Sequence, residues 1–280
     1  MTSAYSMHPV RSSDGTELQL HRWRAGNELA AVCYIHGLQS HSGWLDETGP
    51  ELAARGVSVF AVDRRGSGMS GGPRGDLPSA EIVVADYRLG IAEARSMTRV
   101  PLTGVGQSFG GSVLAAVVAD GSQLFDAVAF VAPALGQQRA RLGSTALAAR
   151  RGICTRDQRP VPLEDGDYTD DRRRLNFMAN DPLMIRRVPA RTFATMVALE
   201  DRYMTATRWS TPSTVYLAVP RTDPIIDLAA ATAALSSSVP DVRVVTFDTD
   251  YHYVEFTQAR VAYWDWLSAT ALAVESGIPA

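Results

Sequence analysis

Gly106-Gln107-Ser108-Phe109-Gly110 is the stretch that decides the fold, because it places a serine between glycines where two apolar runs meet. Residues 100–105 before it predict a short buried strand, and residues 111–119 after it predict an apolar helix. A serine on so sharp a turn lies in strained backbone, and the glycines relieve the crowding. The pattern predicts a hydroxyl held out above a sheet, at the positive end of a helix. Alone, it is also typical of an ordinary tight turn.

Further apolar runs on both sides of this turn predict the sheet. Residues 31–35, 57–62 and 125–132 are continuous apolar runs, as expected of parallel strands that are covered on both faces. Helical spacing between the runs predicts helices over 44–55 and 80–97. This alternation predicts a mostly parallel, doubly wound α/β sheet with right-handed crossovers. Residues 16–23 alternate in polarity and predict an edge strand, and residues 256–274 predict a C-terminal helix.

Two polar residues follow predicted strands late in the chain. Asp223 follows the run at 217–222, and His252 follows the last strand. Together with Ser108 they give the order Ser, Asp, His, which is the order expected of an α/β-hydrolase. A serine hydroxyl is a weak nucleophile at neutral pH and needs a base within hydrogen-bond reach. We expect His252 to be that base; His41 is the rival near the site.

Two further motifs strengthen this interpretation. His36-Gly37 is followed by His41-Ser42-Gly43, and a glycine-rich turn reads Asp63-Arg64-Arg65-Gly66-Ser67-Gly68-Met69-Ser70. With these motifs the chain resembles the α/β-hydrolase family, most closely its monoacylglycerol lipase, lysophospholipase and serine aminopeptidase-like branch. The resemblance covers nearly the whole chain and is weakest between about residues 136 and 212. It implies an α/β-hydrolase fold with a helical lid inserted after the sixth strand.

The acid of the triad is assigned by the resemblance. Asp223 matches the family position Gly-x-x-Asp, although Pro220 stands where glycine is usual. Its carboxylate would fix the tautomer of the histidine and stabilise the imidazolium. Asp227 and Asp250 remain the alternatives.

The oxyanion hole needs backbone N–H groups, which stabilise the negative charge that develops on a carbonyl oxygen. One expected donor is the N–H of Phe109, the residue after the nucleophile. The other is the N–H of Leu38, in the loop that follows His36-Gly37. The turn after Asp63 lacks the Gly-Lys-Ser/Thr of a phosphate loop, so we interpret it as turn architecture. No cluster of His, Cys and carboxylates has metal-ligand spacing, so we expect no metal and no cofactor.

The strand–helix pattern breaks between residues 136 and 212. We therefore predict a hydrolase core over 1–135 and 213–280, and a mostly helical lid over 136–212, too long for a structureless loop. Within the lid we expect a loop at 159–167 and helix starts at Asn180-Asp181-Pro182-Leu183 and Val188-Pro189-Ala190.

The basic side chains are distributed unevenly. All 27 are arginine; residues 136–212 hold fourteen of them against nine acids, and the remainder holds thirteen against twenty-one acids. A basic segment on an acidic body is often only solvated surface, but it also fits a field that attracts anionic substrates or a membrane surface.

Composition sets the remaining expectations. A chain of 280 residues with 46% hydrophobic residues fits one large soluble domain, and the N-terminus has no secretory signal pattern. Its longest apolar runs are too short to span a membrane, and Cys33 and Cys154 fit free thiols. We expect a cytoplasmic enzyme with a small acyl substrate, anionic or lipid-like, and no nucleic-acid partner.

Three function classes stay open at this point. The first is a serine hydrolase that cleaves a carboxylic ester through an acyl-enzyme. The second uses the same triad as a thioesterase, acyltransferase, amidase or carbon–carbon bond hydrolase. The third is a ligand-binding protein without catalysis, which predicts a degraded triad, whereas Ser108, Asp223 and His252 are all present. The fold alone does not choose among them.

Overall fold

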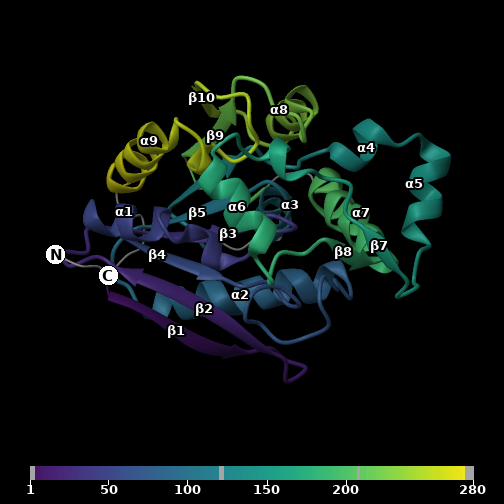
Figure 1. The fold of residues 1–280 in the computed structure, drawn as a ribbon, viewed down its shortest axis with the longest axis horizontal. Helices are drawn as coiled ribbons and strands as arrows, with labels where there is room; N and C mark the ends of the chain where they lie inside the picture. The colour runs from purple at the N-terminus through teal and green to yellow at the C-terminus, as the bar shows by residue number, and fades with distance from the viewer. Residues whose placement is uncertain (1–3, 120–122, 207–208, 213, 275–280) are drawn as a thin grey trace.

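A single eight-stranded sheet organises the chain in the computed structural model, which describes residues 4–119, 123–206, 209–212 and 214–274 (Figure 1). The strand order is β1-β2-β4-β3-β5-β6-β9-β10. Among the described strands of this sheet, only β1–β2 and β2–β4 pair antiparallel, so the predicted mostly parallel sheet is confirmed. The strands are β1 (Ala4–Arg11), β2 (Glu17–Arg24), β3 (Ala30–Ile35), β4 (Val57–Val62), β5 (Leu102–Gln107), β6 (Ala127–Val131), β9 (Val215–Pro220) and β10 (Arg243–Phe247).

Helices cover both faces of this sheet, because the side chains of the buried strands alternate between two hydrophobic clusters. Cys33 and Ile35 of β3 pack in one cluster, and Val32 and Tyr34 pack in the other. The first cluster includes residues of α2 (Ala80–Ser96), α3 (Phe109–Val118) and α8 (Leu228–Ser236). The second includes residues of α1 (Thr48–Ala54) and α9 (Arg260–Leu272). The doubly wound arrangement follows directly from this alternation.

Three predicted elements differ from the structure. The strand over 16–23 is not an edge strand, since β1 pairs along its outer side. The sequence pattern missed β1 because its side chains, such as Tyr5 and Met7, are largely exposed and show no apolar face. The helix expected over 44–55 is divided into a 3₁₀ turn, η1 (Ser42–Leu45), and α1. The C-terminal helix is likewise preceded by a separate 3₁₀ turn, η3 (Val254–Phe256).

Residues 136–212 leave the sheet after β6 and build a layer of their own. In Figure 1, α4, α5 and α7 lie toward the end of the molecule away from α1 and α9. The elements are α4 (Gln137–Arg141), α5 (Ser144–Arg151), β7 (Gln158–Pro160), η2 (Asp165–Asp167), α6 (Arg172–Asn180), β8 (Arg187–Pro189) and α7 (Ala190–Thr205).

This segment corrects two predictions of local structure. Part of the loop expected at 159–167 is strand, because β7 pairs antiparallel with β8. The helix expected to start at Asn180-Asp181 does not exist, since α6 ends at Asn180. The Asp181 carboxylate accepts from the backbone N–H of Leu183, as an N-cap would, but it also binds His41 and Trp44, and no helix follows it. The other expected start is confirmed, because α7 begins at Ala190 directly after Pro189.

Candidate active site

Ser108 stands at the turn between β5 and α3, in backbone that non-glycine residues seldom adopt. Its φ is 55° and its ψ is −122°, a conformation that costs about 1–3 kcal/mol and persists only when its surroundings hold it. A Cβ on Gly106 would lie 2.8 Å from the Gly111 Cα, and a Cβ on Gly110 would collide with the Ile35 carbonyl oxygen. The glycines are therefore required by contacts that let α3 start against the end of β3.

His252 and Asp223 form a buried pair. The His252 Nδ1 lies 2.7 Å from the Asp223 Oδ2, and both side chains are fully shielded from solvent. The other Asp223 oxygen accepts hydrogen bonds from the backbone N–H groups of Ile225 and Ile226, at 2.8 and 2.9 Å. A carboxylate that only accepts makes Nδ1 the protonated nitrogen of the neutral imidazole. Nε2 is then the unprotonated nitrogen with a free lone pair. It is buried without a hydrogen-bond partner among the described residues.

The two alternative acids, Asp227 and Asp250, form other interactions in the structure. Asp227 caps α8, because its carboxylate accepts from the Ala230 N–H at 2.9 Å. Asp250 is solvent-exposed and pairs with Arg221, whose hydrogen bond lowers the pKa of this carboxyl. Asp223 is thus the carboxylate that contacts the His252 ring.

The two histidines that follow β3, His36 and His41, have hydrogen-bond contacts at both ring nitrogens. His41 lies 3.0 Å from Asp181 through Nε2, and its Nδ1 accepts from the Gly43 N–H, so it ties η1 to the loop after α6. His36 accepts from the Arg64 N–H through Nε2, which leaves Nδ1 to donate to the Gly37 carbonyl at 2.8 Å. Burial, helped by the nearby Arg64 cation, lowers the pKa of His36 to about 3. His36 is therefore a neutral structural residue at physiological pH.

The loop that carries Leu38 passes directly beside the serine. A Cβ built on Gly37 would lie 3.5 Å from the Ser108 Cβ and 3.2 Å from the Tyr253 hydroxyl. Three segments therefore meet at Gly37: the loop after β3, the turn at Ser108 and the loop that contains His252. Phe109 is the first residue of α3, where a backbone N–H has no carbonyl partner within the helix.

Residues 136–212 contribute contacts to this site that the sequence did not predict. The His252 and Tyr253 N–H groups donate to the carbonyls of Asp167 and Tyr168, at 3.0 and 3.2 Å. The Tyr168 ring meets His252 edge-on at 5.8 Å, and its hydroxyl donates to the Gln39 Oε1 at 2.6 Å. These contacts join segments that are more than 80 residues apart, and no motif in the sequence predicts them.

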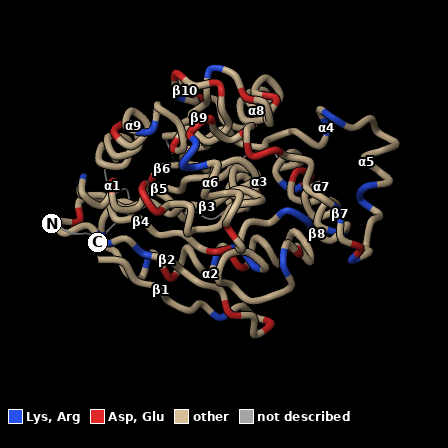
Figure 2. The backbone as a smooth tube through the Cα atoms, viewed as in Figure 1, with Lys and Arg blue, Asp and Glu red and all other residues tan. Residues whose placement is uncertain are grey.

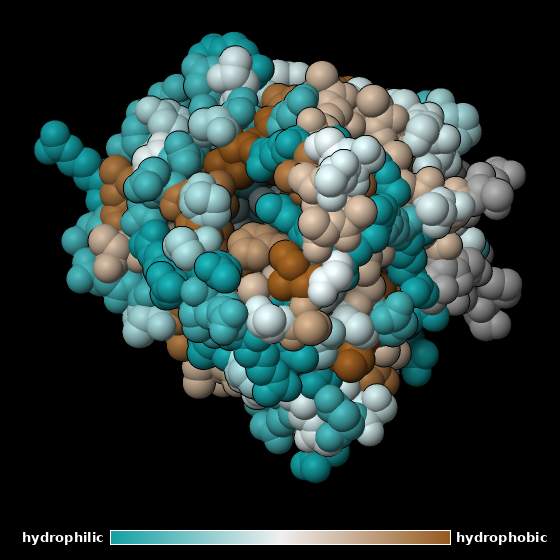
Figure 3. Space-filling view, turned by 90° about the vertical axis from the view of Figure 1, so that its right-hand side faces the viewer, coloured by the Kyte–Doolittle hydropathy of each residue, from teal (hydrophilic) through white to brown (hydrophobic). Residues whose placement is uncertain are grey.

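A hollow marks the surface on this side of the molecule. The space-filling view of the side that carries α5 and α7 shows it with hydrophobic residues along its edge and floor (Figure 3). Within the described residues, no group of three or more His, Cys, Asp or Glu is arranged to hold a metal ion. None of the described helices is long and apolar enough to cross a membrane.

Comparisons with known proteins identify relatives of this chain. Residues 26–257 match the model of a family described as serine aminopeptidase, S33. A monoacylglycerol lipase of Mycolicibacterium smegmatis is 29% identical over 138 residues, which cover 48% of this chain and 49% of that protein. The chain spans at most about half the length of the curated relatives it matches.

Solved structures show the same fold. The crystal structure of the Paleococcus ferrophilus monoacylglycerol lipase superposes with a TM-score of 0.77 at 20% identity, covering 92% of this chain and all of that one. A soluble variant of the Saccharomyces cerevisiae monoglyceride lipase, solved with a substrate analogue, gives a TM-score of 0.77 at 14% identity over 97% of this chain and 95% of its own. The predicted α/β-hydrolase fold is thereby confirmed.

The neutral, buried His36 predicts a specific pH dependence of stability. An unfolded histidine has a pKa of about 6.5, so below that pH the unfolded chain binds a proton that the folded chain refuses down to about pH 3. The contribution of neutral His36 to the free energy of unfolding is therefore complete above the pKa of the unfolded histidine, and it is lost as the pH falls from there toward the folded pKa. Between pH 6.5 and 5, wild type should lose about 1.5 kcal/mol more of its unfolding free energy than His36→Gln. Urea unfolding at both pH values measures this, and equal losses in the two proteins would contradict it.

Proposed function

The chain belongs to the serine aminopeptidase, S33, family of α/β-hydrolases, and on that premise we propose that it cleaves carboxylic esters with Ser108 as nucleophile, His252 as base and Asp223 as acid. The observation that carries the proposal is the buried His252–Asp223 pair, 2.7 Å apart, whose imidazole keeps Nε2 unpaired. The strained backbone at Ser108 adds support, because strain of this kind persists where the surrounding structure enforces it.

The proposed reaction proceeds in two proton-balanced halves. Ser108 Oγ attacks the carbonyl carbon of the ester while His252 Nε2 takes the hydroxyl proton. The bond from carbon to the alcohol oxygen then breaks, and His252 returns the proton to the departing alcohol, which leaves an acyl-enzyme. Water attacks this ester with His252 as base, and breaking the bond to Ser108 Oγ regenerates the serine. Asp223 stays ionised throughout and stabilises the imidazolium.

Two backbone N–H groups would stabilise the oxyanion in both halves, those of Leu38 and Phe109. Each such donor contributes about 3 kcal/mol to the transition state. The approach of Gly37 to Ser108, 3.5 Å from a Cβ built there to the serine Cβ, supports the assignment of Leu38.

An ester is favoured over the other bonds this triad could cleave. Thioesterase, acyltransferase, amidase or carbon–carbon hydrolase chemistry would use the same three residues, so the triad does not decide. The name of the matched Mycolicibacterium relative, monoacylglycerol lipase, favours a lipid-like ester. A non-catalytic binding role is disfavoured, because all three triad residues are present.

We also propose that residues 136–212 act as a lid over Ser108. Its backbone at Asp167 and Tyr168 bonds to the His252 loop, and the Ile185 N–H donates to the Gln39 carbonyl at 2.9 Å. These contacts tie the segment to the loops after β3 and β10. A movement of the segment would therefore be felt at the base and at the oxyanion loop. We further propose a cytoplasmic location, which the two free cysteines, Cys33 and Cys154, support.

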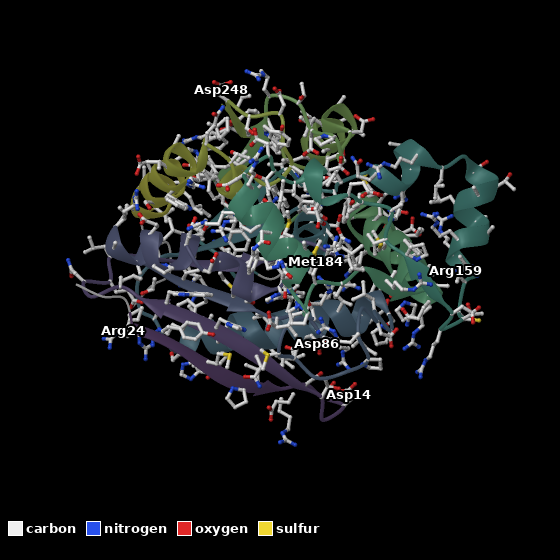
Figure 4. All side chains as sticks on the ribbon, in the orientation of Figure 1. Asp14, Arg24, Asp86, Arg159, Met184 and Asp248 are labelled. Atoms are coloured by element: carbon white, nitrogen blue, oxygen red, sulfur yellow. The ribbon has the colours of Figure 1, made fainter. Side chains whose placement is uncertain are left out.

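Some arginines of residues 136–212 form ion pairs with carboxylates of the hydrolase core. Arg174 pairs with Asp46 and Glu47, and Arg191 pairs with Asp76. The exposed remainder includes Arg156 and Arg159. Arg159 lies at the outer end of the molecule (Figure 4), and Figure 2 shows basic positions in blue along α4, α5 and the neighbouring β7. These outer arginines support a field that attracts anionic or interfacial substrates, and salt would screen that field over about 8 Å at physiological strength.

The first prediction concerns the nucleophile. A fluorophosphonate probe should label one serine, Ser108, and labelling should disappear in Ser108→Ala and in His252→Ala, as measured by intact and peptide mass spectrometry. Ser112→Ala is the matched control, because this hydroxyl lies on the same helix and donates to the Ala134 carbonyl at 2.6 Å. It should label like wild type. Label that persists in Ser108→Ala would place the nucleophile elsewhere.

The second prediction concerns the acid. Asp223→Asn should lower kcat by about 10⁴-fold with folding intact, because the amide favours the wrong tautomer of His252. Asp227→Asn and Asp250→Asn serve as controls and should stay within about threefold of wild type, since these side chains cap α8 and pair with Arg221. Near-normal turnover of Asp223→Asn, with one of the controls inactive, would reassign the acid.

The third prediction concerns the charge of the substrate. With two esters of equal acyl length, kcat/KM for the anionic one should fall as salt rises from 20 to about 500 mM, while the neutral one should hardly respond. Arg156→Gln/Arg159→Gln should flatten the response to the anionic ester. Identical salt responses of the two esters would leave the arginines as ordinary solvated surface.

A further inference from the structure

Arg64 is a buried cation that holds the loop expected to form the oxyanion hole. It follows β4 and is 2% exposed. Its Nη1 donates to the Gly37 carbonyl at 3.0 Å, and its Nη2 donates to the Leu38 carbonyl at 2.8 Å. One planar guanidinium thus holds two successive carbonyls of the backbone beside Ser108.

Because the peptide bond is planar, the contact of Arg64 with the Gly37 carbonyl also fixes the direction of the Leu38 N–H. The Gly37 carbonyl and the Leu38 N–H belong to the same planar, trans peptide unit, so they point in opposite directions. Arg64 and the His36 Nδ1–H both donate to that carbonyl oxygen. Because the carbonyl is held toward Arg64, the Leu38 N–H, in the same plane, points away from Arg64.

The same guanidinium also contacts the second proposed donor residue. Its Cζ lies 5.4 Å from the centre of the Phe109 ring, a distance at which a cation and an aromatic face attract each other. Arg64 therefore contacts both residues whose N–H groups we assign to the oxyanion hole. Phe109 itself is 2% exposed and cannot move away without opening the core.

The guanidinium of Arg64 makes no close ion pair, although the neighbouring Asp63 carboxylate attracts it from farther away. No ion pair within the described residues includes it, and its Nε is buried without a hydrogen-bond partner there. The neighbouring Arg65 differs, since it pairs with Asp86 and Asp14 and so fastens its loop to α2 and to the β1–β2 hairpin (Figure 4). Burial lowers the pKa of Arg64 despite the nearby Asp63 carboxylate, so the cation is only partly compensated. An oxyanion that forms next to the loop would add negative charge on its other side during the reaction.

We infer that Arg64 is a positioning residue of the oxyanion hole: it orients the Leu38 N–H through the Gly37 carbonyl and adds positive charge behind the forming oxyanion. This rests on the proposed function, because it presumes that Ser108 attacks a carbonyl. Arg64 touches no reacting atom, so its effect should be found in the transition state and not in the binding of substrate. From the sequence alone Arg64 belongs to a glycine-rich turn, and no local pattern there indicates a contact with the loop after β3.

Arg64→Met tests the inference, because methionine keeps much of the packing volume and removes both donors and the charge. With a p-nitrophenyl ester, kcat should fall about 10- to 100-fold while KM stays within about threefold. The affinity for an alkyl boronic acid, whose tetrahedral serine adduct places an oxygen in the oxyanion hole, should fall by a similar factor to kcat/KM. Arg64→Lys should recover part of both losses, since it restores the charge and one donor.

Arg95→Met is the matched control. Arg95 also donates to two backbone carbonyls, those of Val100 and Leu124, but in addition pairs with Asp126, at the opposite end of β5 from Ser108. This variant should lower the unfolding temperature and leave kcat and the boronate affinity within about threefold of wild type. If Arg64→Met does not fold, Arg64→Gln and Arg64→Lys give the same comparison with one donor retained.

The outcomes separate the two proposals. A wild-type level of kcat in folded Arg64→Met or Arg64→Gln, or a loss confined to KM, would overturn the inference while an active, Ser108-labelled wild type upheld the proposed function. A loss of kcat without a parallel loss of boronate affinity would also overturn it. A wild type that neither hydrolyses esters nor labels at Ser108 would overturn the proposed function and this inference together.

Discussion

The contact on which the site depends is the close approach of the start of α3 to the end of β3. Gly110 lies so near the Ile35 carbonyl that no side chain fits there. This approach lets the chain turn at Ser108 with a φ of 55°, and it sets the serine beside the loop that follows β3. A longer or looser turn would separate the Ser108 hydroxyl from the backbone N–H groups that we propose for the oxyanion hole. The strain at Ser108 is held by the buried strands on both sides.

The parallel sheet then explains how residues far apart in sequence come together. Strands β4, β3, β5, β6, β9 and β10 are neighbours and run in the same direction, so their carboxyl ends meet at one edge. Arg64 follows β4, the Gly37–Leu38 peptide follows β3, and Ser108 follows β5. Asp223 follows β9, and His252 follows β10. Ligands of open α/β sheets bind outside the carboxyl ends of strands for this reason.

The sequence predicted the elements that repeat a strong local pattern and missed those determined by distant contacts. The turn at Ser108 and the apolar strands around it were predictable, because their glycines and apolar runs are local signals. The strand β1 was not, because half-exposed residues such as Tyr5 and Met7 give it no apolar face. The helix expected at Asn180 failed because the Asp181 carboxylate is committed to His41, Trp44 and its own turn. Such a commitment depends on η1, about 140 residues away, and cannot be inferred from a local pattern.

The site collects groups that a stable core would avoid. Arg64 is a buried cation without a close ion pair among the described residues, His36 is held neutral, and the Nε2 of His252 lacks a hydrogen-bond partner there. Each of these is unfavourable in the resting protein, by about 1–3 kcal/mol for an unpaired polar atom. Two of them are complementary to species that would exist only during the proposed acyl transfer: Nε2 of His252 to the proton of Ser108, and Arg64 to a negative oxygen in front of the Leu38 N–H. If the proposed reaction holds, the resting protein is preorganised for a charge distribution that it does not yet contain, and the two hydrophobic clusters on the faces of the sheet supply the stability that permits this arrangement.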